Sequence, residues 1–358
     1  MDDAHVEKVL DALEVGNPRK DLEAIRRSRG IEKGMASSWI QQSQQYLSWR
    51  DEDSSHNVWV CGGAGKGKTM AAMAMVEDLG HRAGPESDSA VMGHFFCDEH
   101  DKNKSNALDV LKSLAWQLLR VRKDLARHFF GEENVSKGSA QRGDAEYEFE
   151  SLSRLWKCLQ AALSDPSANT VFFVINSLDQ IEAESRQQLL SKVASFRPAI
   201  LDDENDSSGP FVKWLFLSSH RDDIWESLHE ATILNLDDGS HSAKQDDDLR
   251  AYVNRKVNQI VSAQKYSRPL TYFIKSYICL RARGKSNYDW VNLVCLELES
   301  GELPHSAVRR RLEELPTDLF PMYDQVASRV SNNFSFPMVH LGEENDADWG
   351  YDPGTQGL

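Results

Sequence analysis

The amino-acid sequence predicts an α/β fold, in which a parallel sheet with helices on both faces is followed by an all-helical unit. Two observations predict this fold. Between about residues 51 and 240, short apolar runs alternate with segments of helical periodicity, a pattern typical of parallel strands joined by crossover helices. After residue 240 the strand-like runs stop, and only helical periodicities continue to about residue 330. The chain of 358 residues is long enough for about two domains with a large core.

Residues 1–50 are predicted to form a helical lead-in. Val6 and Leu13 belong to a helical pattern that the sequence GNPR interrupts. A second helical part follows, in which Trp39 and Tyr46 are expected to face a core. We interpret this region as a lead-in and not as an independent domain.

Residues 51–240 are predicted to form the domain that contains the sheet. Its strands are expected at residues 57–62, at 90–98, from 171 onward, at 211–219 and at 231–236. Helices are expected between them at residues 69–84, 108–119, 149–165 and 189–196. In such a sheet the ligand binds beyond the carboxyl ends of the strands, so polar residues at those ends are the first candidates for a site.

Residues 241–330 are predicted to form a helical subdomain, because apolar residues recur on one face of each helical pattern. The polar residues 131–144 and the acidic residues 201–210 are expected to be surface loops. The acidic and aperiodic residues 331–358 are expected to be a disordered tail. Bulky residues in apolar periodic contexts are expected in the core, and these are His94, Trp156, Trp214, Trp225 and Trp290.

Composition limits the partners and the compartment. The 41 basic and 56 acidic residues give a net charge of −15, which disfavours nucleic acid and anionic membrane surfaces as partners. No apolar run approaches the length of about 18 residues that a membrane-spanning helix needs. The five cysteines are scattered without a CxxC pair, and the N-terminus has no apolar signal segment. Both features favour reduced thiols and a cytoplasmic location.

The sequence GGAGKGKT, residues 62–69, matches the phosphate-binding pattern G-x-x-x-x-G-K-S/T. It lies after a predicted strand and before a predicted helix, the context that the pattern requires. In such a loop, backbone amides surround the β-phosphate, Lys68 reaches the β- and γ-phosphates, and the Thr69 hydroxyl suits Mg²⁺. Lys66 either neutralises phosphate charge or is a solvated loop lysine. The residues expected to contact the nucleotide are Gly62, Gly63, Ala64, Gly65, Lys66, Gly67, Lys68, Thr69 and Met70.

The order of motifs resembles the NACHT class of signalling proteins, within the STAND group of P-loop NTPases, and especially the NLR-like receptors of fungi. The resemblance rests on a series of segments along most of the chain: NPRKDLEAI, VWVCGGAGKGKTM, HFFCD, VFFVINSLDQ, VKWLFLSSHRDDI, YDWVNLVCLELE and LEELPTDLFPMYDQV. It implies a nucleotide-dependent switch, in which an ADP-bound resting form exchanges to ATP and then self-associates. It also implies bound Mg²⁺ and association with related NACHT proteins.

The second nucleotide motif of that class corresponds to residues 171–180 and departs from the usual pattern. The class has an Asp that orients Mg²⁺ at the position of Asn176, and Asp then Glu at positions 179 and 180; here only Asp179 is retained. Asn176 keeps an acceptor oxygen without a charge, and Gln180 cannot accept a proton from attacking water. Loss of a general base typically lowers the rate about 10²- to 10⁴-fold. The simpler alternative is that Asn176 and Gln180 only cap the strand end.

The end of the strand at residues 211–219 also departs from the class. Where Ser-Arg is common, this chain has Ser219, His220 and Arg221. A cation at this place could detect the γ-phosphate, and Arg221 could equally pair with Asp222 or Asp223 in solvent.

The sequence therefore predicts a nucleotide-binding switch core of a signalling protein of the innate-immunity or heterokaryon-incompatibility kind. It is expected to bind ATP or ADP, with GTP still open although no N/T-K-x-D pattern is present, and to hold Mg²⁺ at Thr69 and Asn176. The candidate catalytic residues are Asp179 and Arg221, with weak or absent hydrolysis. Two alternatives stay open, an active ATPase that uses Asp179 and a non-hydrolysing adaptor or scaffold. A small-molecule kinase is a third, without a recognisable Arg-rich lid.

Overall fold

The computed structural model describes residues 3–31, 38–83, 90–129, 149–197, 210–283, 287–299 and 304–330. The surface loop expected at residues 131–144 lies outside the described residues, as do most of the acidic loop at 201–210 and the whole tail expected at 331–358.

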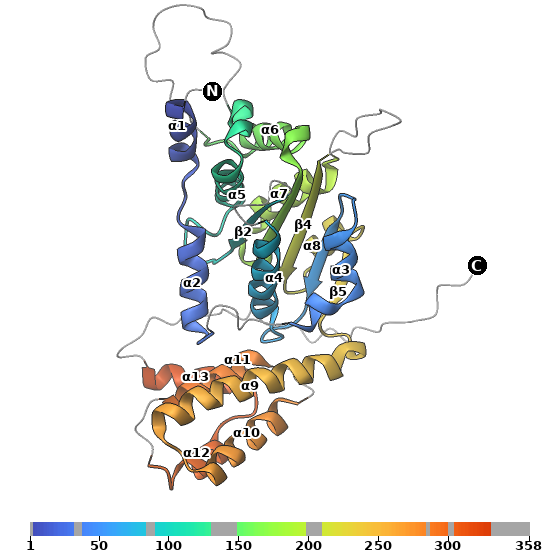
Figure 1. The fold of residues 1–358 in the computed structure, drawn as a ribbon. Helices are drawn as coiled ribbons and strands as arrows, with labels where there is room; N and C mark the ends of the chain where they lie inside the picture. Colours follow the sequence, from blue (N-terminus) through green and yellow to red (C-terminus); the bar gives the residue numbers. More distant parts are fainter. Residues whose placement is uncertain are drawn as a thin grey trace, which may run out of the picture.

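The sheet confirms the predicted fold class. Its described strands are all parallel, in the order β2-β3-β4-β1-β5 (Figure 1). They are β1 (Asn57–Cys61), β2 (Ala90–Phe96), β3 (Thr170–Asn176), β4 (Phe211–Ser218) and β5 (Thr232–Asn235). One row across the sheet pairs His94 with Val174, Val174 with Leu215, Leu215 with Val58, and Val58 with Thr232. All five strands therefore end at one edge, where a ligand of a parallel sheet is expected to bind.

Helices cover both faces of the sheet, and successive strand residues alternate between the two cores. Val58 and Val60 face the core under the helix that follows β1, whereas Trp59 and Cys61 face the opposite core. The first face is covered by α4 (Lys68–Arg82), and the second by α5 (Ala107–Val121), α6 (Leu152–Leu163), α7 (Ala183–Ser195) and α8 (Asp222–Leu228). Short 3₁₀ helices are η1 (Trp39–Gln42), η2 (Lys123–Phe129), η4 (Pro166–Ala168), η5 (Leu178–Gln180) and η6 (Gly239–His241).

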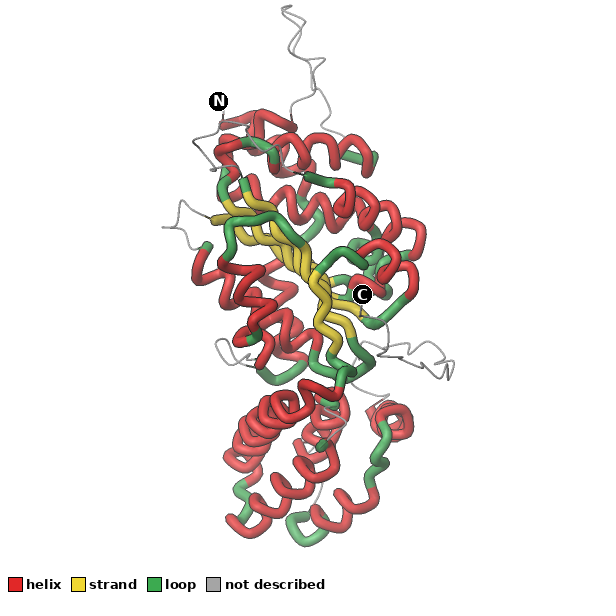
Figure 2. Tube along the Cα trace, turned by 90° about the vertical axis from the view of Figure 1, so that its right-hand side faces the viewer, coloured by secondary structure: helices red, strands yellow, loops and turns green. Residues whose placement is uncertain are grey.

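The helices after residue 241 pack at the end of the sheet where the strands stop (Figures 1 and 2). They are α9 (Ser242–Gln264), α10 (Arg268–Ala282), α11 (Tyr288–Glu299), α12 (Val308–Glu314) and α13 (Leu319–Val330). Their apolar faces, including Leu249 and Val253, join the same continuous core as α4 and the first face of the sheet. No helix in the described ranges has the length and apolar content needed to cross a membrane.

The N-terminal helices pack against the sheet domain at separate places. They are α1 (Asp3–Leu13), α2 (Pro18–Ser28) and α3 (Gln44–Asp51). The apolar face of α1 joins the core under α5, and Tyr46 and Trp49 of α3 are buried against the opposite face. Lys213, buried in β4, donates from Nζ to the carbonyl oxygens of Trp49 at 2.8 Å and Arg50 at 3.2 Å. This lysine therefore satisfies the carbonyls at the C-terminal end of α3 and anchors the helix to the sheet.

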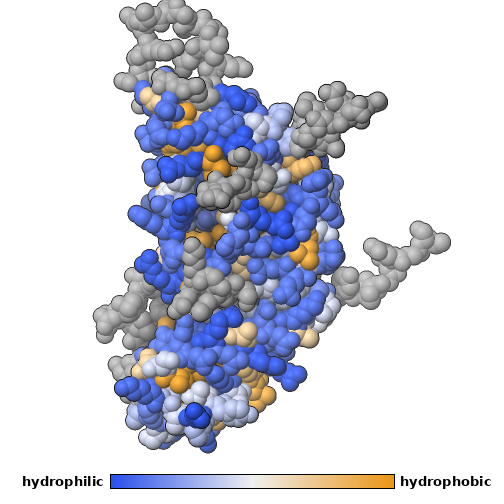
Figure 3. All heavy atoms as spheres, in the orientation of Figure 1, coloured by the Kyte–Doolittle hydropathy of each residue, from blue (hydrophilic) through white to orange (hydrophobic). Residues whose placement is uncertain are grey.

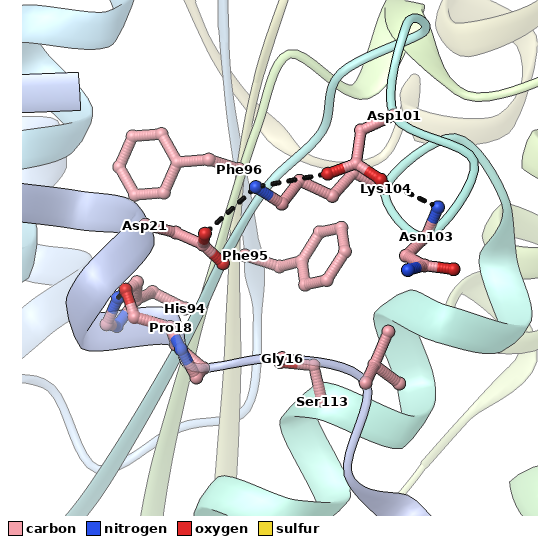
Figure 4. Close-up of a pocket in the computed structure, with 11 residues that line it drawn as sticks. Gly16, Pro18, Asp21, His94, Phe95, Phe96, Asp101, Asn103, Lys104 and Ser113 are labelled. Carbon is pink, nitrogen blue, oxygen red and sulfur yellow. Dashed lines mark hydrogen bonds and ion pairs between the residues drawn. The ribbon is translucent and has the colours of Figure 1, made fainter. Parts of the chain in front are cut away.

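A cavity of about 150 Å³ lies between α2 and the edge strand β2 (Figure 4). Lys104 crosses it, with Nζ 2.9 Å from Asp21 Oδ1 and 3.4 Å from Asp101 Oδ2. His94, only 5% exposed, has Nε2 3.3 Å from the carbonyl oxygen of Pro18. The Nδ1 atom of His94 has no hydrogen-bond partner among the described residues. The cavity therefore lies at the contact between α2 of the N-terminal lead-in and the edge strand β2.

The expected core residues are buried with one exception. Trp156, Trp214 and Trp290 are buried, but Trp225 is 45% exposed, so its prediction as a core residue is wrong. Trp225 lies on the short helix α8, and its ring covers Trp59 from outside. The surface in Figure 3 is mainly hydrophilic, with apolar residues in separate small patches, as a net charge of −15 suggests.

Burial of His94 makes the stability of the fold depend on pH. Desolvation lowers the pKa of His94 to about 4, below its value of about 6.5 in an unfolded chain. The unfolded chain therefore takes up the proton first, and stability is lost as the pH falls from about 6.5 toward 4. Between pH 7 and pH 5 we expect a loss of about 2 kcal/mol in the free energy of unfolding from this group.

Urea denaturation at both pH values checks this expectation. His94→Gln, which keeps a donor for the Pro18 carbonyl but does not titrate, is expected to lose about 2 kcal/mol less than the natural protein over that interval. His81→Gln, at an exposed position of α4, serves as the control and should behave like the natural protein. Equal losses for all three proteins would contradict the expectation.

Candidate functional site

The phosphate-binding loop connects the end of β1 to the start of α4. Gly65 and Gly67 have φ values of 73° and 86°, in the left-handed region where glycine carries no Cβ penalty. Gly67 is the N-cap of α4 and makes no side-chain capping bond. The N-terminus of α4 therefore presents its positive dipole end and N–H groups, a favourable place for an anion.

Lys68 folds back onto its own loop. Its Nζ donates to the carbonyl oxygens of Gly62 at 2.6 Å and Gly63 at 2.7 Å. Burial lowers the pKa of Lys68, and the carboxylates of Asp179, Asp289 and Asp237 oppose that shift by raising the pKa. Because these acids come from three different segments, the fold has gathered negative charge around the loop lysine.

The second nucleotide motif lies next to the loop and contains two unpaired acceptors. Asn176, the last residue of β3, is 3% exposed and donates from Nδ2 to Ser177 Oγ at 2.9 Å. The Oδ1 atoms of Asn176 and Asp179 are buried and have no hydrogen-bond partner among the described residues. Ser177 between them has a φ of 59°, an uncommon value for a residue with a Cβ. Buried acceptors are rarely left unpaired, so this pair suits an ion or an ordered water.

Arg186 holds the second motif in place, a contact that was not predicted from the sequence. This residue of α7 is 1% exposed, and its Nε donates to Asp223 Oδ2 at 2.8 Å. Its Nη1 donates to the carbonyl oxygens of Asp179, at 3.2 Å, and Ile181. The sequence did contain a signal, because Arg186 occupies the same helical face as the apolar Leu189 and Leu190.

The sensor candidates after β4 have other partners in this structure. Arg221 is half-exposed, and its Nε lies 3.4 Å from Asp223 Oδ1, the solvent pairing that the sequence left open. The ring of His220 packs against Trp59 and Trp225, with centroid distances of 5.7 and 6.1 Å. The γ-phosphate role of Arg221 stays a prediction.

The first turn of α11 lies on the phosphate loop, a contact that the sequence did not predict. The backbone N–H of Tyr288 donates to the Gly65 carbonyl oxygen at 2.7 Å. A Cβ placed on Gly65 would lie 2.2 Å from Asn287 Oδ1, and one on Gly67 would lie 2.7 Å from the Tyr288 ring. The helical subdomain therefore requires glycine at both positions and forms one wall of the site.

Two further contacts complete the loop environment. Lys66 has Nζ 3.4 Å from Asp237 Oδ1, so its charge is paired by a carboxylate. Met70 is buried in the core under α4, which leaves its backbone as its only possible contribution to binding. The phosphate loop follows β1 and the second motif follows β3, so both lie at the carboxyl edge of the sheet. This is the edge at which the sequence placed the polar residues of both motifs.

The sequence of this chain is similar to a known protein family and to a known fungal protein. Residues 36–219 match the family model described as Nephrocystin 3, N-terminal. The vegetative incompatibility protein HET-E-1 of Podospora anserina is 24% identical over 328 residues, which are 90% of this chain and 22% of that protein. The chain thus spans about a fifth of the length of this relative.

Solved structures show a weaker likeness. The Aeropyrum pernix ORC2 protein aligns with a TM-score of 0.39 and 13% identity over 83% of this chain and 67% of that one. The PCH-2 protein of Caenorhabditis elegans aligns with a TM-score of 0.37 and 10% identity over 87% of this chain and 69% of that one.

The contact between α11 and the loop generates a stability test. Gly65→Ala introduces a Cβ at a positive φ and against Asn287, so we expect the free energy of unfolding to fall by about 2 kcal/mol or more. Asn287→Ala alone is the reference for the double variant, because it removes the Oδ1 that accepts the Trp290 N–H at 2.9 Å. In that background Gly65→Ala should cost less than in the natural protein, because the steric part of the loss is gone and the backbone part remains. All three variants are measured by chemical denaturation.

Gly239→Ala is the matched control, because a Cβ there meets no atom within 4 Å. We expect its effect to stay within about 0.5 kcal/mol. A Gly65→Ala protein as stable as the Gly239→Ala protein would show that α11 does not rest on the loop in solution.

Proposed function

The chain belongs to the Nephrocystin 3, N-terminal family, and from this premise we propose that it is the nucleotide-binding core of a NACHT-type signalling protein. The resemblance to fungal NACHT-type proteins is confirmed by the family match and by the match to HET-E-1. The proposed ligand is ATP or ADP with Mg²⁺, and the proposed activity is a switch with slow or absent hydrolysis.

The observation that carries the proposal is the geometry of the phosphate loop. Two left-handed glycines shape the loop, and the N-terminus of α4 opens onto it without a side-chain cap. Lys68 is already held at this place by the Gly62 and Gly63 carbonyls. Phosphate oxygens would accept from the loop amides and from Lys68, which supplies both charge and hydrogen bonds.

The residues around the loop fit a magnesium ion. Thr69 offers a hydroxyl, and the unpaired Oδ1 atoms of Asn176 and Asp179 offer buried oxygen acceptors of the kind that Mg²⁺ prefers, directly or through water. When bound, the ion would neutralise phosphate charge. The neutral Asn176 contributes less to this binding than an Asp would, because it carries no charge.

Weak hydrolysis follows from the same motif. Gln180 cannot serve as a general base, and Asp179 is the acid that this segment retains. Its unpaired Oδ1 and its electrostatic effect on Lys68 support an active ATPase that uses Asp179 as the second candidate function. The third candidate, a non-hydrolysing adaptor, corresponds to a site in which Asp179 does not contribute to hydrolysis.

We also propose self-association or association with related NACHT proteins, in signalling of the vegetative-incompatibility kind named for the relative. The net charge of −15 supports protein partners over nucleic acid, and the free cysteines support a cytoplasmic location.

Removal of Lys68 tests nucleotide binding. Lys68→Ala is expected to weaken the binding of Mg-ADP about tenfold to a hundredfold, because a charge-assisted contact to phosphate is lost. Calorimetric titration measures the affinity, and mass spectrometry of the denatured protein identifies any copurified nucleotide, with ADP expected. Lys192→Ala is the control, because this partly exposed lysine of α7 has Nζ 3.4 Å from Ser153 Oγ and does not contact the loop. A natural protein that binds neither ADP nor ATP contradicts the proposed function.

Restoration of the missing acids tests the account of hydrolysis. The double variant Asn176→Asp with Gln180→Glu is expected to release phosphate about a hundredfold faster than the natural protein, because it supplies a metal-binding charge and a general base. Asp179→Asn in the natural background should abolish any residual turnover. Lysine-dependent turnover at ordinary ATPase rates in the natural protein would instead favour the active-ATPase alternative.

A further inference from the structure

Asp237 lies beside the phosphate loop at the carboxyl edge of the sheet. It follows β5, which pairs with β1, and the N–H of Leu236 donates to the Cys61 carbonyl oxygen at 2.7 Å. This bond extends the strand pairing by one residue. Asp237 therefore lies beside Gly62 and Gly63, the first residues of the phosphate loop.

The carboxylate of Asp237 contacts both the backbone and a side chain of the loop. Its Oδ2 accepts from the Gly63 N–H at 2.7 Å, and its Oδ1 lies 3.4 Å from Lys66 Nζ. The backbone that carries it is fixed on both sides. The Asp237 N–H donates to Asn235 Oδ1 at 2.9 Å, and Gln245 Nε2 donates to the Leu236 carbonyl oxygen at 2.7 Å.

We propose that Asp237 is a specificity-determining residue that makes the phosphate loop favour ADP over ATP. Its fixed negative charge holds Lys66 away from the phosphates and opposes the additional negative charge of the γ-phosphate. The inference rests on the proposed nucleotide binding. It assigns to Asp237 the preference of that same site for ADP over ATP.

The size of the effect follows from the exposure of the carboxylate. ATP carries one more negative charge than ADP, so a fixed anion at the rim disfavours ATP more than ADP. The Asp237 side chain is 45% exposed, so water and salt screen its charge. Exposed charge pairs typically change an equilibrium about twofold to fivefold. We therefore expect a change of about threefold in the ratio of the two affinities.

Asp237 can be changed without loss of the other features of the site. Asp179 and Asp289 also raise the pKa of Lys68, and both remain in the Asp237 variant. The substitution Asp237→Asn keeps an oxygen that can accept the Gly63 N–H and removes the charge alone. Its effect therefore reports the charge and not the geometry of the loop.

The experiment is calorimetric titration of the full chain with Mg-ADP and Mg-ATP at pH 7. Asp237→Asn is expected to raise the ratio of ATP affinity to ADP affinity about threefold, and the gain should shrink as salt increases. Asp238→Asn is the matched control, because it removes the same charge one residue later. The Asp238 carboxylate accepts from the N–H and Oγ of Ser240, at 3.0 and 2.9 Å, and not from the loop.

A second variant tests the same idea from the lysine side. Lys66→Gln leaves the charge of Asp237 without its partner and is expected to lower the ATP-to-ADP affinity ratio. In the Lys66→Gln background, Asp237→Asn should raise the ratio less than it does alone, because one route of its action is through Lys66. If Asp237→Asn does not fold, Asp237→Ser is measured in its place, because its hydroxyl oxygen can also accept the Gly63 N–H without a charge.

The outcomes separate this inference from the proposed function. An unchanged ratio in Asp237→Asn and Lys66→Gln proteins that both bind nucleotide overturns the role of Asp237 and leaves the proposed function intact. An equal shift in Asp238→Asn also overturns it, because the effect would then be one of net charge. Failure of the natural protein to bind either nucleotide removes both conclusions.

Discussion

The close packing of the first turn of α11 against the glycine loop is the constraint on which the rest of the structure depends. The Tyr288 N–H bonds to the Gly65 carbonyl oxygen, and the surfaces of Asn287 and Tyr288 leave no room for a Cβ on Gly65 or Gly67. The helical subdomain is therefore not an appendage to the sheet. One apolar core runs from the first face of the sheet under α4 into α9 and α11, so the sheet and the helical subdomain are packed as one unit.

The N-terminal lead-in ties the same parts together through charged groups. Arg29 at the end of α2 pairs with Asp289 in the first turn of α11, and the buried Arg26 pairs with Glu77 of α4. Buried ion pairs add little net stability, because desolvation offsets their attraction, but the loss of one partner is costly. Their effect here is to fix α2 against both the loop helix and the subdomain.

The negative charge already present around the loop explains why a neutral amide is less costly than an acid at position 176. Three carboxylates, Asp179, Asp237 and Asp289, already act on Lys68. A fourth acid in the buried position of Asn176 would add uncompensated negative charge whenever metal is absent, and such a charge is expensive to bury. The neutral amide at position 176 avoids that cost.

Local periodicity and short spacings such as Gly62 to Thr69 were enough to predict the fold class and to locate the phosphate loop and the second motif along the chain. The same periodicity predicted which tryptophans are buried in the core, and Trp225 was the exception. The periodicity of a short surface helix does not show which of its faces packs against the rest of the protein. The tertiary structure alone shows the contacts of Asp237, Asn287, Tyr288 and Arg186 around the loop and the second motif. Strand order brings β5 beside β1, and packing of the subdomain brings α11 onto a loop more than 200 residues earlier in the chain, distances that no local pattern encodes.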